Sequence, residues 1–446
     1  MLDFAKSGSS PINHSIPQGL QEKYVRLSIV TQFYPPDFAA TGQLIEELAN
    51  HLQRQGMQVT VFTGQPGYAF KKASAPRSEQ SGQLFVERSR TTRLLSNRIR
   101  GKALNGLIFA CRSALRLLKP KSRGDVLLLT TAPPFLPVLG YLANRLFGVP
   151  YICLLYDLYP DVAVELDILS NDHWISRLWD LVNRHVWRQA ESIIVLSSSM
   201  KQRVVTKCPD VANKIAIIHN WANPEWIVPL PKAQNWFAVK HRLVDRFTVL
   251  YSGNMGRCHD IDTILEVAQE LRQEPVQFLF IGNGAKRQEC ITRARRLGLD
   301  NCLFLPYQDK PDLPFSLTAC DLSLVTISPG MEGLVAPSKL YSALAAGRPI
   351  AVICEDHSYL HQIIQDANCG AAFRHGDSQG VTEFIRRLAQ NRQLTEQLGA
   401  AGRGYLESHF APEVIARQYG AVIRRSALKQ ELRKGAPQAV DISVNR

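Results

Sequence analysis

One stretch in the C-terminal half of the chain carries groups that suit a bound anion. It reads SPGMEGLVAPSKLYSALAAGRPI and covers residues 328–350. Pro337 is typical of the first turn of a helix, and Gly347 followed by Arg-Pro is typical of its end, about three turns later. Free N–H groups at such a helix start, with the Ser338 hydroxyl and the Lys339 cation, favour an anion such as a diphosphate. The alternative interpretation is an ordinary buried junction between a loop and a helix.

Two carboxylates follow a short apolar run in the first half of the chain. The run YICLLY is followed directly by Asp157, and Asp161 comes four residues later. Enzymes with α/β folds place reactive groups at the ends of buried parallel strands, so either carboxylate is suited to chemistry on a substrate. Both could instead cap the helix that follows, and the residues alone leave the two interpretations open.

The elements that must position these groups alternate between strand and helix. Residues 24–30 predict a strand, residues 43–55 a helix closed by a glycine, and residues 57–64 a second strand. This is a βαβ unit of a doubly wound parallel sheet, which binds ligands at the carboxyl ends of its strands. Amides at Thr41 and Gly42 open the helix and could face a phosphate, or the pair could be a plain cap. A Gly-x-Gly-x-x-Gly motif is missing here, which argues against ordinary dinucleotide binding.

The second half of the chain restarts the same pattern. FTVLYSGNMGRCHDIDTIL predicts strand, glycine loop and helix, and VQFLFIGNGAKR begins the pattern again. A chain of 446 residues also exceeds one typical core, so we predict two Rossmann-like α/β domains joined by a linker rich in Pro and Asn. The expected limits are a disordered leader, two domains, a final helix and a loose basic tail, at 1–23, 24–225, 226–410, 411–428 and 429–446.

Composition limits the classes of partner. The net charge of +13 favours anionic partners such as nucleotides and phospholipid headgroups. Nucleic acid is disfavoured because no known binding motif or aromatic stacking surface appears. Nine scattered cysteines without a C-x-x-C pair fit a reducing cytosol and give no metal site or disulfide framework.

A basic region suggests a membrane surface. Residues 86–123 contain eleven Lys and Arg and a single acid, Glu87. Within this region, residues 102–119 predict a helix with a broad apolar face and basic flanks. Such a helix could lie on an anionic membrane, or it could pack its apolar face into the domain core. Residues 126–144 are uncharged, but their prolines favour a strand followed by a helix over a membrane span.

Five motifs together resemble the GT-B fold glycosyltransferases of family 4, above all the branch that builds bacterial exopolysaccharides, colanic acid and O-antigens. They are QFYPPDFAATGQLIEELA, DLYPDVA, YSGNMGRCHDIDTIL, FIGNGAKR and APSKLYSALAAGRPI, in the family's order over residues 24–410. The resemblance implies two Rossmann-like domains facing a cleft, with the nucleotide-diphosphate sugar on the second and the acceptor on the first. It also implies a final helix that crosses back to the first domain, and retaining transfer of a hexose-type sugar without metal or cofactor.

The resemblance also implies roles for single residues. Arg257 matches the place where the family sets a basic residue on the phosphates, and an Arg fork suits that task. Asp157 or Asp161 falls where the family carries an acidic or His residue near the reacting sugar. There it would orient the acceptor or stabilise positive charge without forming a covalent bond. Further donor contacts are expected from Gly42, Gly253, Asn254, Gly256, His259, Gly282, Pro306, Glu332, Pro337, Ser338, Lys339 and Ser342.

The chain departs from the family at the ribose end of the site. The family's signature has two glutamates eight positions apart, and their places here are taken by Leu334 and Ser342. Ser342 offers one weaker, neutral hydrogen bond, and Glu332, two residues before Leu334, is an alternative contact for the ribose.

The sequence therefore predicts a retaining glycosyltransferase of cell-surface polysaccharide synthesis. Its acceptor is expected to be lipid-linked or a glycan, and its place the cytoplasmic face of the membrane, in peripheral contact with anionic lipid. Two alternatives stay open: a non-catalytic subunit with the same fold, favoured by the missing glutamates, and a sugar-nucleotide epimerase or phosphorylase.

Overall fold

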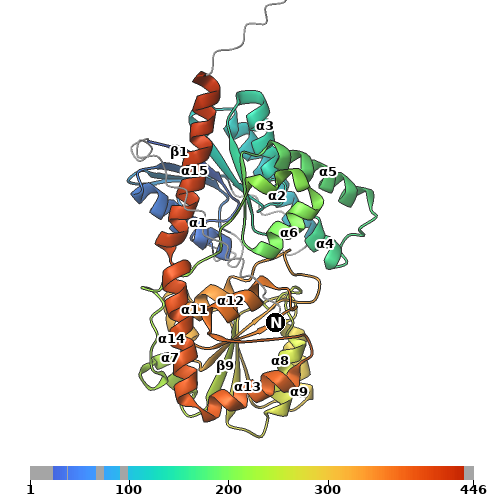
Figure 1. The fold of residues 1–446 in the computed structure, drawn as a ribbon, viewed down its shortest axis with the longest axis vertical. Coiled ribbons are helices and arrows are strands. Elements are labelled where there is room, and N and C mark those ends of the chain that lie inside the picture. Colours follow the sequence, from blue (N-terminus) through green and yellow to red (C-terminus); the bar gives the residue numbers. More distant parts are fainter. Residues whose placement is uncertain (1–23, 38, 67–74, 91–98, 436–446) are drawn as a thin grey trace, which may run out of the picture.

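The computed structural model describes residues 24–37, 39–66, 75–90 and 99–435 (Figure 1). The expected leader, residues 1–23, lies outside these ranges. Two α/β domains are stacked in Figure 1, the N-terminal one above, and the last two helices of the chain follow one another along their side. The predicted fold class, two α/β domains with parallel sheets, is confirmed.

The N-terminal domain is built on an eight-stranded sheet with the strand order β3-β4-β2-β1-β5-β6-β7-β8. All neighbours are parallel except β3 and β4. Every residue of the central strands β5 and β6 is buried, as expected for parallel strands covered on both faces. The strands are β1 (Arg26–Val30), β2 (Gln58–Thr63), β3 (Ser78–Ser81), β4 (Leu84–Arg88), β5 (Val126–Thr130), β6 (Tyr151–Leu155), β7 (Ser192–Val195) and β8 (Ile215–Ile217).

Helices cover both faces of this sheet. Right-handed crossovers from β4 to β5, β5 to β6 and β6 to β7 place α2, α3 and α5 on one face. The connection from β1 to β2 runs in the opposite direction along the sheet and places α1 on the other face. The helices of this domain are α1 (Ala40–Arg54), α2 (Ile99–Leu117), α3 (Pro137–Phe147), α4 (Asp161–Glu165), α5 (Trp174–Gln189) and α6 (Ser198–Lys207).

The C-terminal domain has six parallel strands in the order β11-β10-β9-β12-β13-β14. The direction of the crossovers reverses between the neighbouring strands β9 and β12, and doubly wound sheets bind ligands at the carboxyl edge beside such a reversal. The strands are β9 (Phe247–Ser252), β10 (Val276–Ile281), β11 (Cys302–Leu305), β12 (Leu322–Thr326), β13 (Ile350–Ile353) and β14 (Gly370–Phe373). The helices are α7 (Trp236–Lys240), α8 (Asp262–Glu270), α9 (Arg287–Arg296), α10 (Leu313–Thr318), α11 (Lys339–Ala345), α12 (Tyr359–Ala367), α13 (Ser378–Gln390) and α14 (Arg392–His409).

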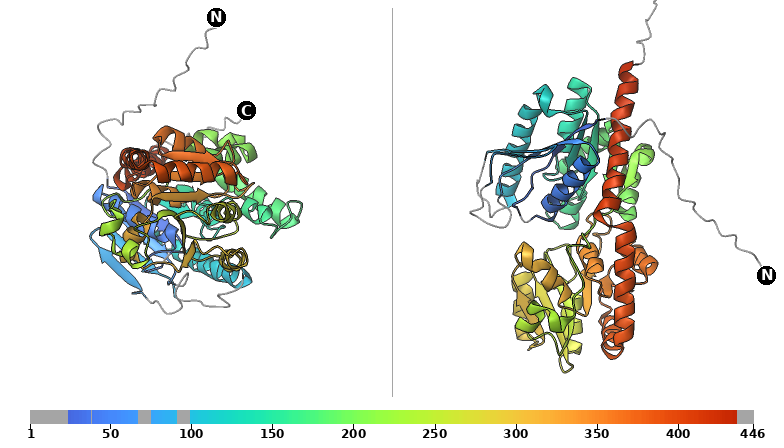
Figure 2. Two further views of the ribbon diagram at one scale, coloured as in Figure 1. Left: turned by 90° about the horizontal axis from the view of Figure 1, so that it is seen from below. Right: turned by 90° about the vertical axis from the view of Figure 1, so that its left-hand side faces the viewer.

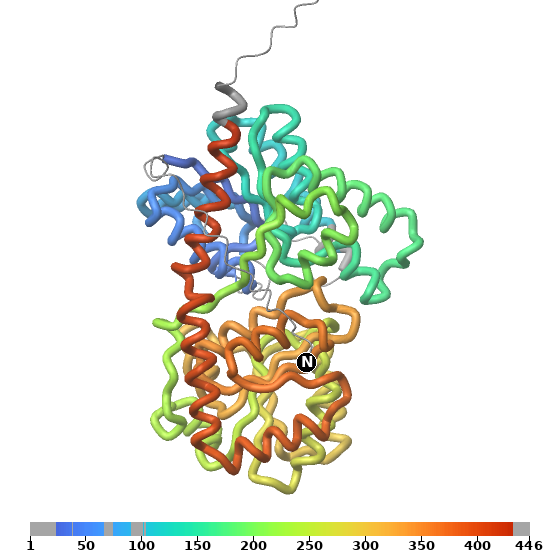
Figure 3. Tube along the Cα trace, in the orientation of Figure 1, coloured from blue at the N-terminus to red at the C-terminus, as the bar shows by residue number. Residues whose placement is uncertain are grey.

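The chain passes between the domains twice, in the linker after β8 and in the helices at its end (Figure 3). Helix α14 lies along the second domain, and α15 (Pro412–Gly435) continues from it along the first domain (Figure 2), where it packs on α1. Arg424 of this helix donates to the carbonyl oxygen of Gln55 at 2.7 Å. A loose tail was expected from residue 429, but Lys429 is still helical and forms an ion pair with Glu191 at 2.9 Å. This contact with the first domain accounts for the longer helix.

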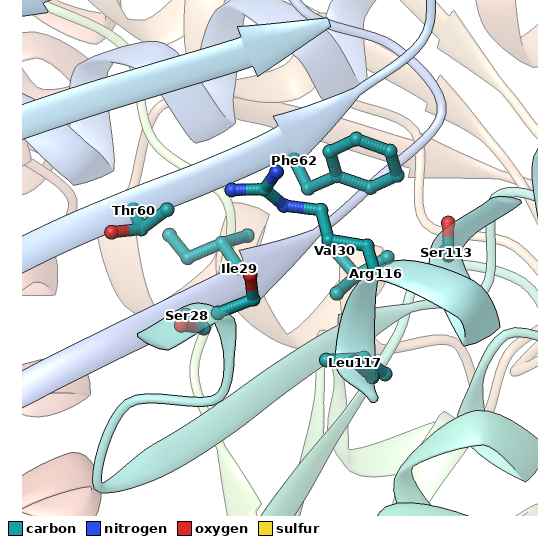
Figure 4. A pocket seen from close by; sticks show the side chains of 9 residues that line it. Ser28, Ile29, Val30, Thr60, Phe62, Ser113, Arg116 and Leu117 are labelled. Carbon is teal, nitrogen blue, oxygen red and sulfur yellow. The ribbon is translucent and has the colours of Figure 1, made fainter. Parts of the chain in front are cut away.

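A small cavity lies inside the first domain, between the sheet and α2 (Figure 4). The Arg116 guanidinium crosses it, 5.0 Å from the ring centroid of Phe62, and forms an ion pair with Glu87. None of the predicted site residues lines this cavity. It is therefore separate from the site described below.

Candidate functional site

Three predicted residues meet at the carboxyl edge of the second sheet because their strands are neighbours. The N–H of Gly253, after β9, donates to the carbonyl oxygen of Ile281 at 2.8 Å. The N–H of Gly282, after β10, donates to the carbonyl oxygen of Leu305 at 3.0 Å. Pro306 follows Leu305 directly. The parallel pairing therefore places Gly253, Gly282 and Pro306 side by side.

The loops at this edge approach each other so closely that side chains are excluded. Gly282 has a φ of +135°, and a Cβ there would overlap the carbonyl oxygen of Gly253. Gly284 has a φ of +150°, and a Cβ there would overlap the backbone of Met255. Only glycine tolerates this conformation and this proximity. Asn254, between these contacts, is exposed.

A half-buried lysine lies against this glycine loop. Lys339 is the first residue of α11, and a Cβ added to Gly253 would lie 2.8 Å from its Cε. Its Nζ lies 3.1 Å from Nε2 of His259 and 5.1 Å from the ring centroid of Tyr251. No carboxylate among the described residues forms an ion pair with it. Burial lowers the pKa of Lys339 to about 7, because the charged form is poorly solvated there.

His259 serves as the partner of this lysine. Its Nδ1 lies 2.8 Å from the carbonyl oxygen of Thr326, so Nδ1 carries the proton and donates it. Nε2 is then an acceptor for Lys339. Burial, and next the charge of Lys339, lower the pKa of His259 to about 3, so the ring is neutral. We expected His259 to be a donor to the ligand, but both ring nitrogens already have partners.

Two further cations surround the glycine loop. Arg257 is exposed, and its carbonyl oxygen accepts from the Ser328 hydroxyl at 3.2 Å, which joins the loop after β9 to the loop after β12. Lys286, at the end of the second glycine loop, donates from Nζ to the carbonyl oxygen of His259 at 2.9 Å. Within the described part of the chain, Arg257, Lys286 and Lys339 have no carboxylate partner. Three such cations around one backbone loop suit a diphosphate.

The helix start that carries Lys339 is shorter than the sequence predicts. Helix α11 begins at Lys339 with Ser338 as its N-cap, two residues after Pro337, and it has seven residues. The Ser342 hydroxyl donates a hydrogen bond to the carbonyl oxygen of Lys339 at 3.0 Å, so its proton is used within α11. Gly347 follows the helix with a φ of +62°, as expected for a helix end.

Asp157 lies where the two domains touch. It follows β6, and its backbone forms an antiparallel bridge with Val335 in the loop after β12. The next residue, Leu158, donates its N–H to the carbonyl oxygen of Leu334 at 3.0 Å. Burial raises the pKa of Asp157 to about 6. Asp157 therefore stands at the junction between the first domain and the loop that leads to Lys339.

Asp161 is engaged elsewhere. It is the first residue of α4, and its carboxylate accepts from Nζ of Lys207 at 2.6 Å. The same ammonium group lies 2.6 Å from the carboxylate of Asp180. Asp161 is thus part of an ion-pair cluster that ties α4 to α5 and α6. The structure therefore distinguishes the two carboxylates: Asp161 is in an ion-pair cluster, and Asp157 is at the domain junction.

Glu332 is buried in the loop after β12. It is 1% exposed, and among the described residues neither carboxylate oxygen has a hydrogen-bond partner. Burial raises the pKa of Tyr359, and the charges of Tyr341 and Glu332 add to the shift, which places Glu332 near the start of α12. The ribose contact considered for Glu332 stays a prediction.

Gly42 serves packing in this structure. It lies in the first turn of α1, and a Cβ there would be 3.0 Å from the backbone of Phe33 and Tyr34. Its N–H donates to the carbonyl oxygen of Ala39 at 2.9 Å. The amide expected to face a phosphate is therefore used inside the helix start.

Sequence reasoning missed two residues of this region. Lys286 could have been found, because GNGAKR and GNMGRC both begin with Gly-Asn after a strand and carry a cation at their fifth position. Arg203 of α6 had no such signal. It donates to the carbonyl oxygens of Glu332 at 3.1 Å and Gly330 at 3.2 Å, residues that lie far away in the sequence. It thereby fastens the loop after β12 to the first domain, as the orange loop in Figure 3 shows.

Two features are absent from the residues that the structure describes. No three His, Cys, Asp or Glu side chains are gathered in a way that could hold a metal ion. None of the helices is both long and apolar enough to cross a membrane.

Two family models match most of the chain between them. The glycosyl transferase 4-like domain matches residues 40–221, and the glycosyl transferases group 1 model matches residues 233–405. The chain is 26% identical over 402 residues to the probable glycosyltransferase WbjE of Pseudomonas aeruginosa, covering 90% of this chain and 98% of that protein. It is 24% identical over 405 residues to the putative colanic acid biosynthesis glycosyl transferase WcaI of Escherichia coli (strain K12), covering 86% and 96%.

Solved structures share the fold. Sucrose-phosphate synthase from Thermosynechococcus elongatus aligns with a TM-score of 0.72 and 18% identity, covering 90% of this chain and 98% of that one. Anabaena Alr3699/HepE in complex with UDP and glucose aligns with a TM-score of 0.67 and 14% identity, covering 90% and 100%.

Proposed function

We propose that this chain, which belongs to the GT-B glycosyltransferases of family 4, moves a hexose-type sugar from a nucleotide-diphosphate sugar to a lipid-linked or glycan acceptor. The transfer retains the configuration of the sugar and needs neither metal nor cofactor. The observation that carries the proposal is the group of three cations around the glycine loop. The HepE structures contain UDP or UDP-glucose, which supports a nucleotide sugar as the donor here.

The three cations can stabilise the negative charge that bond breaking produces. When the bond between the sugar and the diphosphate breaks, negative charge develops on the leaving phosphate oxygens. Arg257 offers a planar fork of donors, and Lys339 and Lys286 offer ammonium groups from the other sides. Backbone N–H groups of the glycine loop can approach the phosphates closely because no side chains intervene. Fixed protein charges thereby stabilise the leaving group without reorganisation.

We assign Asp157 to the sugar side of that bond. It lies at the end of β6, against the loop that leads to Lys339. A carboxylate there stabilises positive charge on the sugar ring and orients the acceptor hydroxyl. Its pKa, raised by burial to about 6, also makes it a better proton acceptor than an exposed aspartate. No covalent bond to Asp157 is required.

A screen of nucleotide sugars tests the proposed function. Calorimetry with UDP-, GDP- and ADP-sugars is expected to find at least one ligand with a Kd in the range of roughly 1 μM to 1 mM, as is usual for enzyme substrates. The absence of binding by the whole panel would favour a non-catalytic member, for which Ser342 in place of an acid is the motivating observation. Conversion of the donor without any acceptor would favour an epimerase.

Donor affinity is expected to fall as the pH rises above about 7. Lys339 is charged below its pKa of about 7 and neutral above it, and a diphosphate binds the charged form better. The Kd should be nearly constant from pH 6 to 7 and then rise by up to about ten-fold per pH unit. A nucleotide sugar is the right probe, because its phosphates have no second ionisation near neutral pH. Calorimetry across this range measures the effect.

The matched variant is Lys339→Met. It removes the titrating group but keeps the length of the side chain against Gly253. It should bind the donor weakly at pH 6 and show no further loss up to pH 8. A wild-type protein whose Kd does not change with pH would show that Lys339 does not contact the phosphates.

A further inference from the structure

The outward faces of three neighbouring helices on the first domain are unusually apolar. Helices α2, α3 and α5 lie on the same face of the sheet, and α3 contacts both α2 and α5. The opposite face is covered by α1 and α15. Figure 1 shows α5 standing out at the side of the upper domain, with α4 between it and the lower domain. The solvent-facing surface of α2, α3 and α5 is called the three-helix face below.

Helix α2 is apolar on both sides. Its inward residues, including Phe109 and Leu117, belong to the domain core, as one interpretation of the sequence predicted. Yet every exposed position between residues 104 and 118 is also apolar: Leu104, Leu107, Cys111, Leu115 and Leu118. Packing within the domain does not explain why the exposed positions described here carry only leucine and cysteine.

Helices α3 and α5 continue this surface. Trp174, Leu178 and Leu181 recur at the spacing of one helix face and are 67%, 50% and 59% exposed. On α3, Leu142 and Leu146 are exposed as well. Single exposed apolar residues are ordinary, but stripes on three adjacent helices form a patch, which marks an interaction site.

Charge identifies the kind of partner. The three helices carry eight Lys and Arg residues and a single acid, Asp180, which is paired with Lys207. Three of the cations also have partners: Arg116 pairs with Glu87 inside the domain, Arg177 with Asp172 and Arg188 with Asp210. Exposed Arg145 and Arg177 lie among the apolar residues of α3 and α5. A second copy of the chain would bring the same positive charges together, which disfavours self-association through this face. A surface with anionic phosphates and an apolar interior complements both features.

We propose that the three-helix face docks on a bilayer that contains anionic lipid. Its leucines and Trp174 reach the boundary of the acyl chains, and its arginines contact the phosphate headgroups. Trp174, at the start of α5, suits the level of the headgroups. The inference deepens the proposed function and rests on it for the lipid-linked acceptor. Tyr159, two residues after Asp157, stacks on Trp179 of α5 with their ring centroids 6.0 Å apart, so docking by this face would bring a lipid-linked acceptor toward Asp157.

Vesicle flotation with purified full-length protein tests the face. The probe is vesicles of phosphatidylcholine and phosphatidylglycerol in equal parts, with pure phosphatidylcholine as the comparison. We expect the wild-type protein to float with the anionic vesicles and binding to weaken at high salt. The variant Trp174→Ser/Leu178→Ser/Leu181→Ser should lose at least about ten-fold in binding, since three half-exposed apolar side chains no longer enter the bilayer.

The control is Val228→Ser/Val239→Ser, two residues that are about as exposed but lie outside the three-helix face. It should float like the wild-type protein. A second variant, Leu107→Ser/Leu115→Ser on α2, guards against misfolding of the first, and donor binding by calorimetry reports folding of each. The proposal is overturned if the wild-type protein stays unbound, or if both variants float as it does. It is also overturned if light scattering shows a dimer that these substitutions dissociate.

The assay separates this inference from the proposed function. Flotation is measured without any nucleotide sugar, and donor binding is measured without vesicles. A protein that binds donor but not vesicles contradicts only the three-helix face. A protein that floats but binds no donor contradicts only the proposed function.

Discussion

Replacing Arg257 with alanine is expected to lower kcat/KM by at least about two orders of magnitude. Arg257 is an exposed cation on the glycine loop after β9, and no carboxylate among the described residues neutralises it. Its fork of donors is therefore available to the leaving diphosphate, where charge develops only as the bond breaks. The loss should appear mainly in kcat, because a contact that strengthens in the transition state affects the chemical step most. Steady-state kinetics with the donor identified by the screen measures it.

Arg272→Ala is the matched control for this substitution. Arg272 is also exposed and belongs to the same domain, but it precedes β10 and so lies at the opposite edge of the sheet. Its rates should equal those of the wild-type protein. An Arg257→Ala protein with wild-type rates would place the phosphates elsewhere than on this loop.

The second large effect is expected at Asp157. Asp157→Asn keeps the size of the side chain and the backbone bridge to Val335, but it removes the carboxylate charge that the proposed function assigns to the sugar side of the bond. We expect kcat to fall by about two orders of magnitude or more, as is typical when a group acting on the transition state is lost. Donor affinity should change little, because the proposed phosphate contacts belong to the other domain. Calorimetry and steady-state kinetics on the same protein separate the two quantities.

Asp161→Asn provides the comparison. It breaks an ion pair with Lys207 whose partners are about a quarter exposed, so the cost to stability is on the order of 1 kcal/mol. Its catalytic rate should stay within a few-fold of the wild-type value, because Asp161 belongs to the cluster that ties α4 to its neighbours. Equal losses of rate in the Asp157 and Asp161 variants would contradict the separation that the structure makes between them.

The fold was predictable because its signals are local. Buried parallel strands read as short apolar runs, amphipathic helices repeat every three to four residues, and glycine after a strand marks a tight loop. These signals recur twice along the chain, so the two Rossmann-like domains and the family resemblance could be predicted from the sequence. The glycine loop around Arg257 and the lysine at the start of α11 were found by the same means.

Pairings between distant segments were not predictable in this way. His259 was expected to contact the ligand, but its neighbours Thr326 and Lys339, distant in the sequence, use both of its ring nitrogens. Arg203 holds a loop through backbone carbonyls, which carry no sequence signature. The place of Glu332 near the start of α12 likewise depends on a distant segment.

The sequence by itself determined the architecture, the family and the presence of a cationic loop, since each depends on residues that are neighbours along the chain. Only the tertiary structure decided which of the two carboxylates stands at the domain junction. It also decided that the apolar residues of α2 serve the core on one side and leave a second apolar face in solvent. Both outcomes depend on which distant segments pack together, and the spacing of residues within one segment does not specify that packing.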